Sequence, residues 1–162
     1  MSNVFISIGS NLGNKYQNIT SAISKLKKLG KILKISSLYI TSPLENENQP
    51  YFYNCVVEIN TKLKPKELLK KIKEIEKNIG RKESKKRYQP RIIDLDILFY
   101  GKKIIKSKTL TIPHKKLHQR KFVLWPLAEI APDFIHPVLK KTIKKIKDEL
   151  RDPSQRIWLI RE

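Results

Sequence analysis

The stretch Arg91–Phe99, which reads RIIDLDILF, decides the expected fold. Apolar residues alternate with others along it, and this pattern predicts a β-strand, because successive side chains of a strand point to opposite faces. The apolar row comprises Ile93, Leu95, Ile97 and Phe99. The other row carries Asp94 and Asp96, two positions about 6.6 Å apart along an extended backbone. Half-buried carboxylates repel each other and lose hydration, so the pair predicts a positively charged partner on that face.

Two kinds of partner would satisfy the acid pair. Mg²⁺ prefers oxygen ligands, and two such ions held about 3.5 to 4 Å apart are the usual clamp for displacement at phosphorus. The ligand would then be a nucleotide. The alternative is an edge strand whose acids face water or pair with the many lysines of the chain. The stretch by itself leaves both interpretations open.

Length and composition indicate one globular domain, residues 1–162. The chain is long enough to close a core but too short for two ordinary domains, and it is 40% hydrophobic and 31% charged. No leader peptide or membrane-spanning run is visible, and Cys55 is the only cysteine. We therefore expect a cytoplasmic protein with a buried thiol and no membrane partner.

The formal net charge of +20 is large for this length. It could indicate nucleic acid, an acidic membrane or polyphosphate, but the lysines are spread over every predicted helix and loop. An RNA-recognition module shares the expected order of elements, and its third strand should carry a basic-glycine-aromatic signature. Tyr53–Glu58 reads YNCVVE instead. We therefore expect no nucleic-acid partner.

Periodicity predicts the elements that surround the acidic strand. Strands are expected over Asn3–Ile8, Leu33–Tyr39 and Tyr53–Ile59. Helices are expected after a cap at Asn14 and from Pro65, ending at Gly30 and Gly80. The order strand, helix, strand, strand, helix, strand predicts an α+β, ferredoxin-like βαββαβ core, with an antiparallel sheet and helices on one face. Asp94, Asp96 and Asn54 would then project from the other, open face.

The chain beyond the acidic strand predicts less structure. Ile104–Ile105 and Leu110–His114 suggest a hairpin, and Phe122–Leu127 is assigned to packing. A C-terminal helix is expected from the spacing of Leu139, Ile143, Ile146 and Leu150. Since no large apolar stripe is left exposed, we expect a monomer.

Several polar and aromatic residues would converge on the open face if this fold is right. The basic loop 81–90 precedes the acidic strand, and its arginines, with Arg91 and Arg120, suit a metal-bound triphosphate. Phe52 and Phe122 suit a flat ring, and the amide of Asn54 offers both a donor and an acceptor to a heterocycle edge.

The combination of motifs resembles a known family. The motifs are Gly9-Ser10-Asn11-Leu12-Gly13, Gln49-Pro50, Asn54, Gly80-Arg81, Pro90-Arg91-Ile92-Ile93-Asp94-Leu95-Asp96-Ile97, Pro113-His114, Arg120 and the run Leu124–Pro132. Over nearly the whole chain they are similar to those of the 6-hydroxymethyl-7,8-dihydropterin pyrophosphokinases of folate biosynthesis. An acid-x-acid pair alone would be a weak signal.

The resemblance implies transfer of the β,γ-diphosphate of ATP to the pterin hydroxymethyl group, leaving AMP. It implies that Asp94 and Asp96 hold two Mg²⁺ ions and that Arg81 and Arg91 assist the reaction. ATP as co-substrate would contact Glu76, Arg81, Arg87, Tyr88, Arg91, Ile97, Thr111, His114 and Arg120. The pterin would contact Thr41, Ser42, Pro43, Leu44, Phe52, Asn54 and Phe122. Another metal-dependent nucleotidyl or phosphoryl transferase is the alternative.

Four positions depart from the usual pattern of that family. Tyr88 stands where tryptophan is common, Glu83 and Thr109 stand where some members carry arginine, and Lys115 replaces a common aromatic residue. These departures bear on loop closure and ATP affinity rather than on the reaction.

Overall fold

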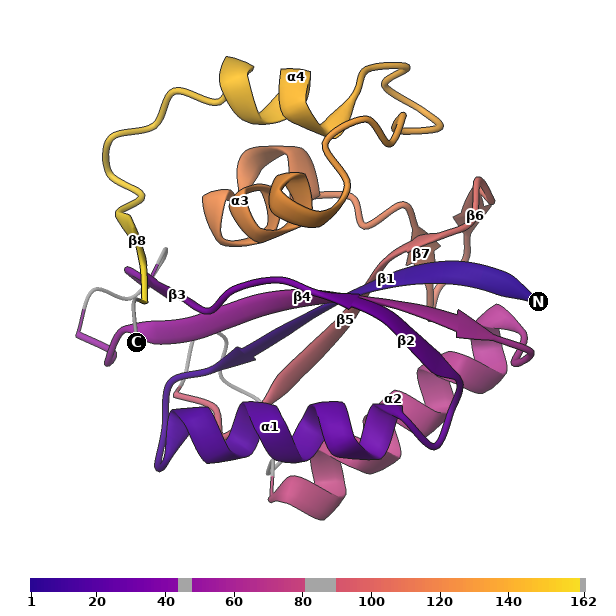
Figure 1. Ribbon diagram of the computed structural model, residues 1–162, viewed down its shortest axis with the longest axis horizontal. Coiled ribbons are helices and arrows are strands. Elements are labelled where there is room, and N and C mark those ends of the chain that lie inside the picture. The colour runs from indigo at the N-terminus through magenta and orange to yellow at the C-terminus, as the bar shows by residue number, and fades with distance from the viewer. Residues whose placement is uncertain (44–47, 81–89, 161–162) are drawn as a thin grey trace.

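The computed structural model describes residues 1–43, 48–80 and 90–160. Its centre is an antiparallel sheet in the order β5-β1-β4-β3-β8, with β2 also paired to β4 (Figure 1). The strands are β1 Ser2–Ser10, β2 Lys31–Ile35, β3 Tyr39–Thr41, β4 Phe52–Thr61, β5 Asp94–Tyr100 and β8 Ile157–Leu159. The expected order of elements and the α+β, ferredoxin-like fold class are confirmed.

Two amphipathic helices, α1 (Lys15–Leu26) and α2 (Pro65–Ile79), cover one face of the sheet (Figure 1). The Asn14 side chain accepts a hydrogen bond of 3.0 Å from the Gln17 backbone N–H, so the predicted cap begins α1. Helix α2 ends at Gly80, where φ is +116°. The apolar sides of both helices pack with the sheet into one buried cluster.

The opposite face is only partly open. Helices α3 (Lys121–Ile130) and α4 (Ile143–Glu149) lie over part of it and form a second buried cluster with residues of β1, β4 and β5 (Figure 1). The sequence indicated packing but no helix for α3, because Pro126 lies inside it. The C-terminal helix begins later than expected, at Ile143, because Lys140 has φ +59° and interrupts the helical pattern.

A β-bulge in β5 corrects the predicted apolar row. Phe5 pairs with Phe99 but Ile6 pairs with Ile97, so Leu98 is an extra residue on this strand. Ile93, Leu95 and Ile97 therefore face α1 and α2, whereas both Leu98 and Phe99 join the second cluster. The prediction was wrong at Phe99, since one inserted residue reverses the alternation beyond it.

The predicted strand Leu33–Tyr39 is divided into β2 and β3. Between them, Ser36 bonds to Val56 through its hydroxyl and its backbone N–H, each at 2.9 Å. The Glu129 carboxylate of α3 accepts hydrogen bonds from the Ser37 backbone, the Ser37 hydroxyl and the Tyr39 hydroxyl. Burial raises the pKa of the Tyr39 hydroxyl, and its hydrogen bond to the Glu129 carboxylate raises that pKa further. The division therefore gives α3 an anchor on the sheet.

The remaining structure links the sheet to α3. Strands β6 (Ile105–Lys106) and β7 (Thr111–Ile112) form the expected hairpin, and the 3₁₀ helix η1 (Leu117–Gln119) leads directly into α3.

Cys55 is buried, as predicted, and burial raises the pKa of its thiol to about 12. Among residues 1–43, 48–80 and 90–160, no helix is both long and apolar enough to span a membrane.

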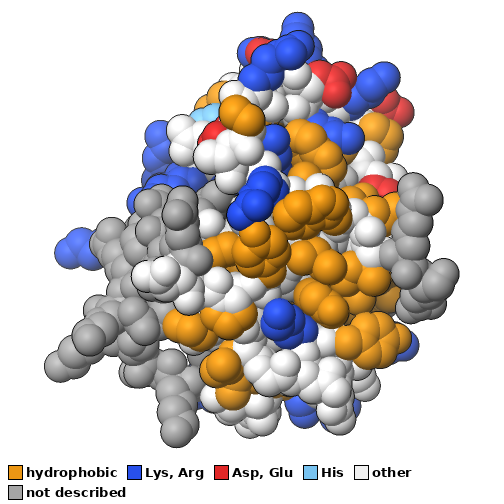
Figure 2. Space-filling model, turned by 90° about the vertical axis from the view of Figure 1, so that its left-hand side faces the viewer, with side chains coloured by type: hydrophobic (Ala, Val, Ile, Leu, Met, Phe, Trp, Pro, Cys, Tyr) orange, Lys and Arg blue, Asp and Glu red, His pale blue; other side chains and the backbone are white. Residues whose placement is uncertain are grey.

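Exposed apolar side chains are more extensive than the sequence indicated. Figure 2 shows a broad apolar area on the face that carries β8. Trp158 and Leu159 of β8 are each 46% exposed, and Leu33 and Ile35 of β2 are 41% and 47% exposed. The premise behind the expected monomer was therefore incomplete, and the oligomeric state stays a prediction.

Candidate active site

A cavity of about 600 Å³ lies on the sheet face that α3 and α4 leave uncovered. One side, here called the sheet wall, consists of residues on β1, β4 and β5: Ser7, Gly9, Phe52, Asn54, Asp94 and Asp96. The facing side, here called the C-terminal wall, includes Lys116, Arg120, Phe122, Asp152 and Gln155. The rim between them includes Thr41, Ser42, Pro43 and Gln49.

Strand register sets the sheet wall. Gly9 of β1 pairs with Asp94 on one side and Asn54 on the other, and Ser7 pairs with Asp96. Directly paired residues of an antiparallel sheet share a face. The two acids therefore lie in adjacent rows on the cavity side of β5, and Asn54 lies across Gly9 from Asp94.

Gly9 leaves the space that the Asn54 amide occupies. A Cβ on Gly9 would lie 2.6 Å from Asn54 Oδ1, which is shorter than real contacts allow. Asn54 Nδ2 donates a 2.6 Å hydrogen bond to Thr41 Oγ1, and the residue is only 5% exposed. The side chain is therefore fixed in a buried position that any larger residue at Gly9 would disturb.

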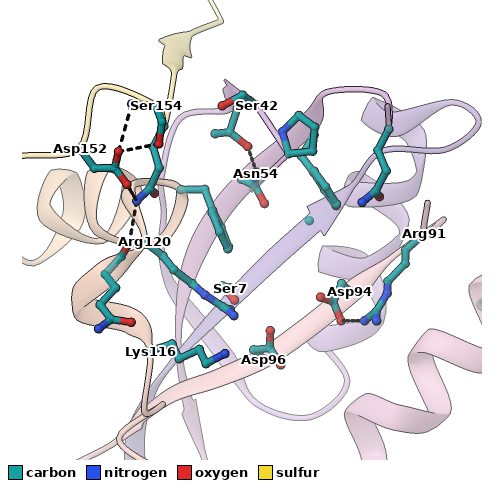
Figure 3. A pocket seen from close by; sticks show the side chains of 18 of the residues that line it. Ser7, Ser42, Asn54, Arg91, Asp94, Asp96, Lys116, Arg120, Asp152 and Ser154 are labelled. Carbon is teal, nitrogen blue, oxygen red and sulfur yellow. Dashed lines mark hydrogen bonds and ion pairs between the residues drawn. The ribbon is translucent and has the colours of Figure 1, made fainter. Parts of the chain in front are cut away.

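The acid pair is partly buried beside a small number of basic side chains among the described residues. Arg91 Nη1 lies 3.5 Å from Asp94 Oδ1, and this is the ion pair drawn in Figure 3. Burial and the nearby Asp94 carboxylate raise the pKa of Asp96 to about 7, despite the opposing charges of Lys73 and Arg120. A cation placed between these carboxylates would favour their ionised forms.

The donor set fits Mg²⁺ held jointly by protein and phosphate. In the described parts of the chain, no group of three or more acids, histidines or cysteines is placed to hold a metal ion. Mg²⁺ is commonly held by one or two carboxylates, with substrate phosphates and water completing its shell. Asp94 and Asp96 match that pattern, with oxygen donors on one face of one strand.

Glu76 of α2 holds the strand between the two acids. It is 2% exposed, its Oε2 accepts a 2.8 Å hydrogen bond from the Leu95 backbone N–H, and its Oε1 lies 3.3 Å from Lys73 Nζ. Since β5 is the edge strand of the sheet and backbone N–H groups lie in the plane of the sheet, Glu76 holds the outer edge of β5. It does not line the cavity.

The turn after β1 ties the ends of the sheet wall together. The Asn11 backbone N–H donates to the Arg91 carbonyl at 3.0 Å, and Asn11 Oδ1 accepts from the Arg91 N–H at 2.7 Å. Asn11 Nδ2 donates to Gln49 Oε1 and to the Pro50 carbonyl, each at 3.1 Å. The Gly9–Gly13 and Gln49–Pro50 motifs therefore meet at Arg91, where the acidic strand begins.

Arg120 and Lys116 bring positive charge to the cavity from the C-terminal wall (Figure 3). The Arg120 guanidinium lies 5.4 Å from the centre of the Phe122 ring. Arg120 is also among the charges that lower the pKa of Asp96. The wall thus combines a cation and an aromatic face opposite the acids.

His114 lies beside this wall in its neutral form. Burial, followed by the charge of Arg120, lowers its pKa to about 4, despite the opposing Asp94 carboxylate. Its Nδ1 accepts a 3.2 Å hydrogen bond from the Lys116 backbone N–H, so the ring proton is on Nε2. His114 can therefore donate one hydrogen bond but brings no charge near pH 7.

The structure brings together most of the predicted substrate site. Around the cavity it places Thr41, Ser42, Pro43, Phe52, Asn54, Arg91, Asp94, Asp96, Arg120 and Phe122. Glu76, Ile97, Thr111 and His114 do not line it, and Ile97 faces α1 and α2, so their nucleotide contacts stay predictions. The predictions for Leu44, Arg81, Arg87 and Tyr88, and the departure at Glu83, lie outside the described residues.

Sequence reasoning missed the cavity residues Ser7, Lys116, Asp152 and Gln155, and it used Gly9 and Gln49 as motif residues without giving them a place in the site. The pattern of β1 could have identified Ser7 and Gly9, because both fall on the same face of a strand that pairs with the acidic one. No local signal marks Asp152 or Gln155, because their place depends on a distant contact with α3.

Comparisons with known proteins find relatives over most of the chain. Residues 5–132 match the family profile of 7,8-dihydro-6-hydroxymethylpterin-pyrophosphokinase (HPPK). The 2-amino-4-hydroxy-6-hydroxymethyldihydropteridine pyrophosphokinase of Aquifex aeolicus is 44% identical over 149 residues, which cover 92% of each chain. Folic acid synthesis protein FOL1 of Dictyostelium discoideum is 46% identical over 89% of this chain, which spans only 22% of that protein.

Solved structures support the same fold. The HPPK-DHPS protein of Plasmodium falciparum superimposes with a TM-score of 0.73 at 20% identity, over 91% of this chain and 45% of that one. The family resemblance indicated by the sequence motifs is thus confirmed by relatives that match most of the chain. The chain belongs to the 7,8-dihydro-6-hydroxymethylpterin-pyrophosphokinase family.

Proposed function

We propose that the protein transfers the diphosphate of ATP to the hydroxymethyl group of 6-hydroxymethyl-7,8-dihydropterin, giving the pterin diphosphate and AMP. One observation carries this proposal. In a chain of this family, Asp94 and Asp96 face Arg120 and Phe122 across one cavity. The acids suit a metal-bound polyphosphate, and the aromatic and amide groups suit a heterocycle.

Asp94 and Asp96 are the proposed ligands of two Mg²⁺ ions. Ions bound there would neutralise the phosphate oxygens and polarise the phosphorus that is attacked. Arg91 is held beside Asp94 by the ion pair and by the Asn11 hydrogen bonds, so its guanidinium is already positioned near the acids. Arg120 faces them from the other wall. These residues align and neutralise charge, and no nucleophilic side chain is required.

The pterin is proposed to bind between the rim and Phe122. Asn54 Nδ2 is bonded to Thr41, and its Oδ1 remains as an acceptor at the cavity for a donor on the ring edge. Phe52 and Phe122 offer apolar faces on the two walls. The Arg120 guanidinium lies over the Phe122 ring, so we propose that it moves when the pterin ring binds.

The chemistry separates this proposal from its alternatives. Another phosphoryl transferase would use the same acids but has no need for Asn54 and two phenylalanines around one cavity. An RNA-binding module would place no acid pair on its open face, because the acids repel phosphate unless a metal intervenes. Family membership also favours the pyrophosphokinase.

The decisive experiment is to incubate the purified protein with ATP, Mg²⁺ and the hydroxymethyl dihydropterin and to identify the nucleotide product. AMP that forms only when the pterin is present is the expected result. ADP would indicate a different kinase, and AMP without pterin would indicate hydrolysis. Omission of Mg²⁺ should abolish product formation if the acid pair works as proposed.

We further propose that residues 1–162 act as one catalytic domain and as a monomer. The strands of the sheet wall belong to one sheet. That sheet also includes β8, which follows the C-terminal wall in the chain and pairs with β3 at the rim. No residue of a second copy is needed to complete the cavity as described. Sedimentation velocity at micromolar concentration tests the monomer, and a concentration-dependent dimer would point to the exposed apolar residues of β2 and β8.

A further inference from the structure

The segment 150–156 closes the C-terminal wall, although it lies beyond residues 5–132 that match the family profile. It connects α4 to β8 and places Asp152 and Gln155 at the cavity. At its far end it meets the rim: the Ser42 N–H donates to the Arg156 carbonyl at 3.0 Å, and the Arg156 N–H donates to Ser42 Oγ at 2.9 Å. The segment therefore bridges the rim and α3.

The Gln155 side chain uses its whole amide to hold the backbone around Arg120. Its Oε1 accepts from the Lys121 N–H at 2.9 Å, and its Nε2 donates to the Gln119 carbonyl at 2.8 Å and to Asp152 Oδ2 at 3.0 Å. Both amide N–H groups and the carbonyl are thus engaged, and the residue is 8% exposed. The two backbone bonds lie on either side of Arg120.

The backbone at the start of α3, beside Arg120, needs a hydrogen-bond acceptor from outside the helix. Arg120 has an extended backbone, with φ −123° and ψ 110°, where η1 ends and α3 begins. The first N–H groups of a helix have no acceptor within the helix, and no local side chain caps this end of α3. Gln155 provides the missing acceptor from 34 residues away. The direction in which the chain leaves Arg120, and with it the place of Phe122, therefore depends on this amide.

Gln155 is in turn fixed by its own loop. Asp152 Oδ1 accepts hydrogen bonds from the Ser154 N–H at 3.0 Å and from the Ser154 hydroxyl at 2.5 Å. Its other oxygen, Oδ2, accepts from Gln155. One carboxylate therefore holds the loop together. It also fixes the orientation of the Gln155 amide toward the backbone at Arg120.

We propose that Gln155 is a positioning residue of the active site, which holds Arg120 and Phe122 at the cavity through its two hydrogen bonds to the backbone on either side of Arg120. The inference rests on the proposed function for its kinetic consequences. Its structural premise, that the amide sets the backbone from which the Arg120 side chain reaches the cavity, can be tested without the reaction.

The kinetic test is a double-mutant cycle of Gln155→Leu with Arg120→Ala. Gln155→Leu should lower kcat/KM for the pterin by about 10- to 100-fold, because a small misplacement of aligned groups has effects of that size. In the Arg120→Ala background the same change should cost clearly less, because the part that acts through Arg120 is already lost and only the part that acts through Phe122 remains. Equal losses in both backgrounds, or no loss in the wild type, would overturn the proposal.

Thr142→Ala provides the control for general destabilisation. It removes the side-chain cap of α4, where Thr142 Oγ1 accepts from the Lys145 N–H at 3.2 Å, away from the cavity. It should lower the melting temperature and leave kcat/KM unchanged. A matching loss of kcat/KM in Thr142→Ala would mean that Gln155 acts only through stability. If Gln155→Leu does not fold, Gln155→Glu replaces it in the cycle, because glutamate keeps the acceptor for Lys121 and loses both donors.

An NMR measurement tests this inference separately from the proposed function. If the wild type makes no AMP from ATP and the pterin, the proposed function fails. The ¹H–¹⁵N resonance of Arg120 Nε still reports on the positioning. That resonance should shift in Gln155→Leu and stay in place in Thr142→Ala. An unshifted Arg120 resonance in Gln155→Leu would overturn the proposal.

Discussion

The sheet wall and the C-terminal wall of the cavity are held in place by different kinds of interaction. On the sheet wall, continuous backbone ladders of β1 with β4 and β5 set the positions of Asp94, Asp96 and Asn54. On the C-terminal wall, Arg120 and Phe122 depend on side-chain bonds between segments far apart in sequence. The first wall is therefore fixed by many cooperating bonds, whereas at the second the bonds that flank Arg120 are few and single substitutions can remove them.

The largest effect is expected from the acids of the sheet wall. Asp94→Ala or Asp96→Ala should lower kcat by about 10³-fold or more, because a metal that provides several kcal/mol of charge stabilisation loses a ligand. Asp148→Ala, which removes an exposed acid of α4, is the control and should leave kcat unchanged. Near-normal turnover of Asp94→Ala with Mg²⁺ would contradict the two-metal proposal. Circular dichroism checks that the fold is retained.

A substitution at Gly9 tests how rigid the sheet wall is. Gly9→Ala places a methyl group 2.6 Å from Asn54 Oδ1, so the amide must move and KM for the pterin should rise by about 10- to 100-fold. In an Asn54→Ala background the clash is absent, and Gly9→Ala should add little. If Gly9→Ala raised KM equally in both backgrounds, the damage would lie in the strand and not in the amide.

Phe122→Ala measures the aromatic part of the C-terminal wall. Pterin binding should weaken by about 1 to 3 kcal/mol through lost aromatic burial. Titration calorimetry with the pterin and an unreactive ATP analogue gives the affinity. An unchanged affinity would exclude ring stacking at Phe122 and would leave Phe52 as the aromatic contact.

The smallest effect concerns the loop that precedes α4. His136 Nδ1 accepts from the Val138 and Leu139 N–H groups at 3.1 and 3.0 Å, and burial, with His118 nearby, lowers its pKa to about 4. A depressed histidine pKa means that the folded state favours the neutral ring. This contribution to stability is complete above about pH 6.5 and is lost as pH falls toward 4.

His136→Asn keeps an acceptor for the same turn but cannot titrate in this range. The free energy of unfolding, measured with urea between pH 7 and 4.5, should fall less with acid in His136→Asn than in the wild type. Parallel pH profiles for the two proteins would show that His136 does not contribute. Activity at pH 7 should be the same in both, since His136 does not line the cavity.

The same difference between the walls explains what the sequence could predict. The alternation of β5 and the cap at Asn14 are local signals, and they predicted the acid pair and the start of α1. The bulge at Leu98 could not be predicted, because both registers bury apolar residues and the second cluster that selects one is formed by α3 and α4. Helix α3 was missed because Pro126 argues against a helix locally, while packing and the Glu129 anchor favour it.

Gln155 shows the limit of sequence reasoning most clearly. Its surroundings, Asp152-Pro153-Ser154-Gln155, look like an ordinary polar turn. Its partners are backbone groups around Arg120, and backbone groups leave no trace in a side-chain pattern. Family motifs identified Arg120 itself, but only the folded structure identifies what holds it.

The extra residue at Leu98 lets one strand contribute to two buried clusters. Before it, the buried apolar side chains of β5 pack with α1 and α2; Leu98 and Phe99 pack with α3 and α4, and Tyr100 returns to the first cluster. Asp94 and Asp96 lie before this irregular point, where the pairing of β5 with β1 is regular. The acid pair therefore keeps its register with Ser7 and Gly9, while the bulge accommodates the packing of the residues that follow.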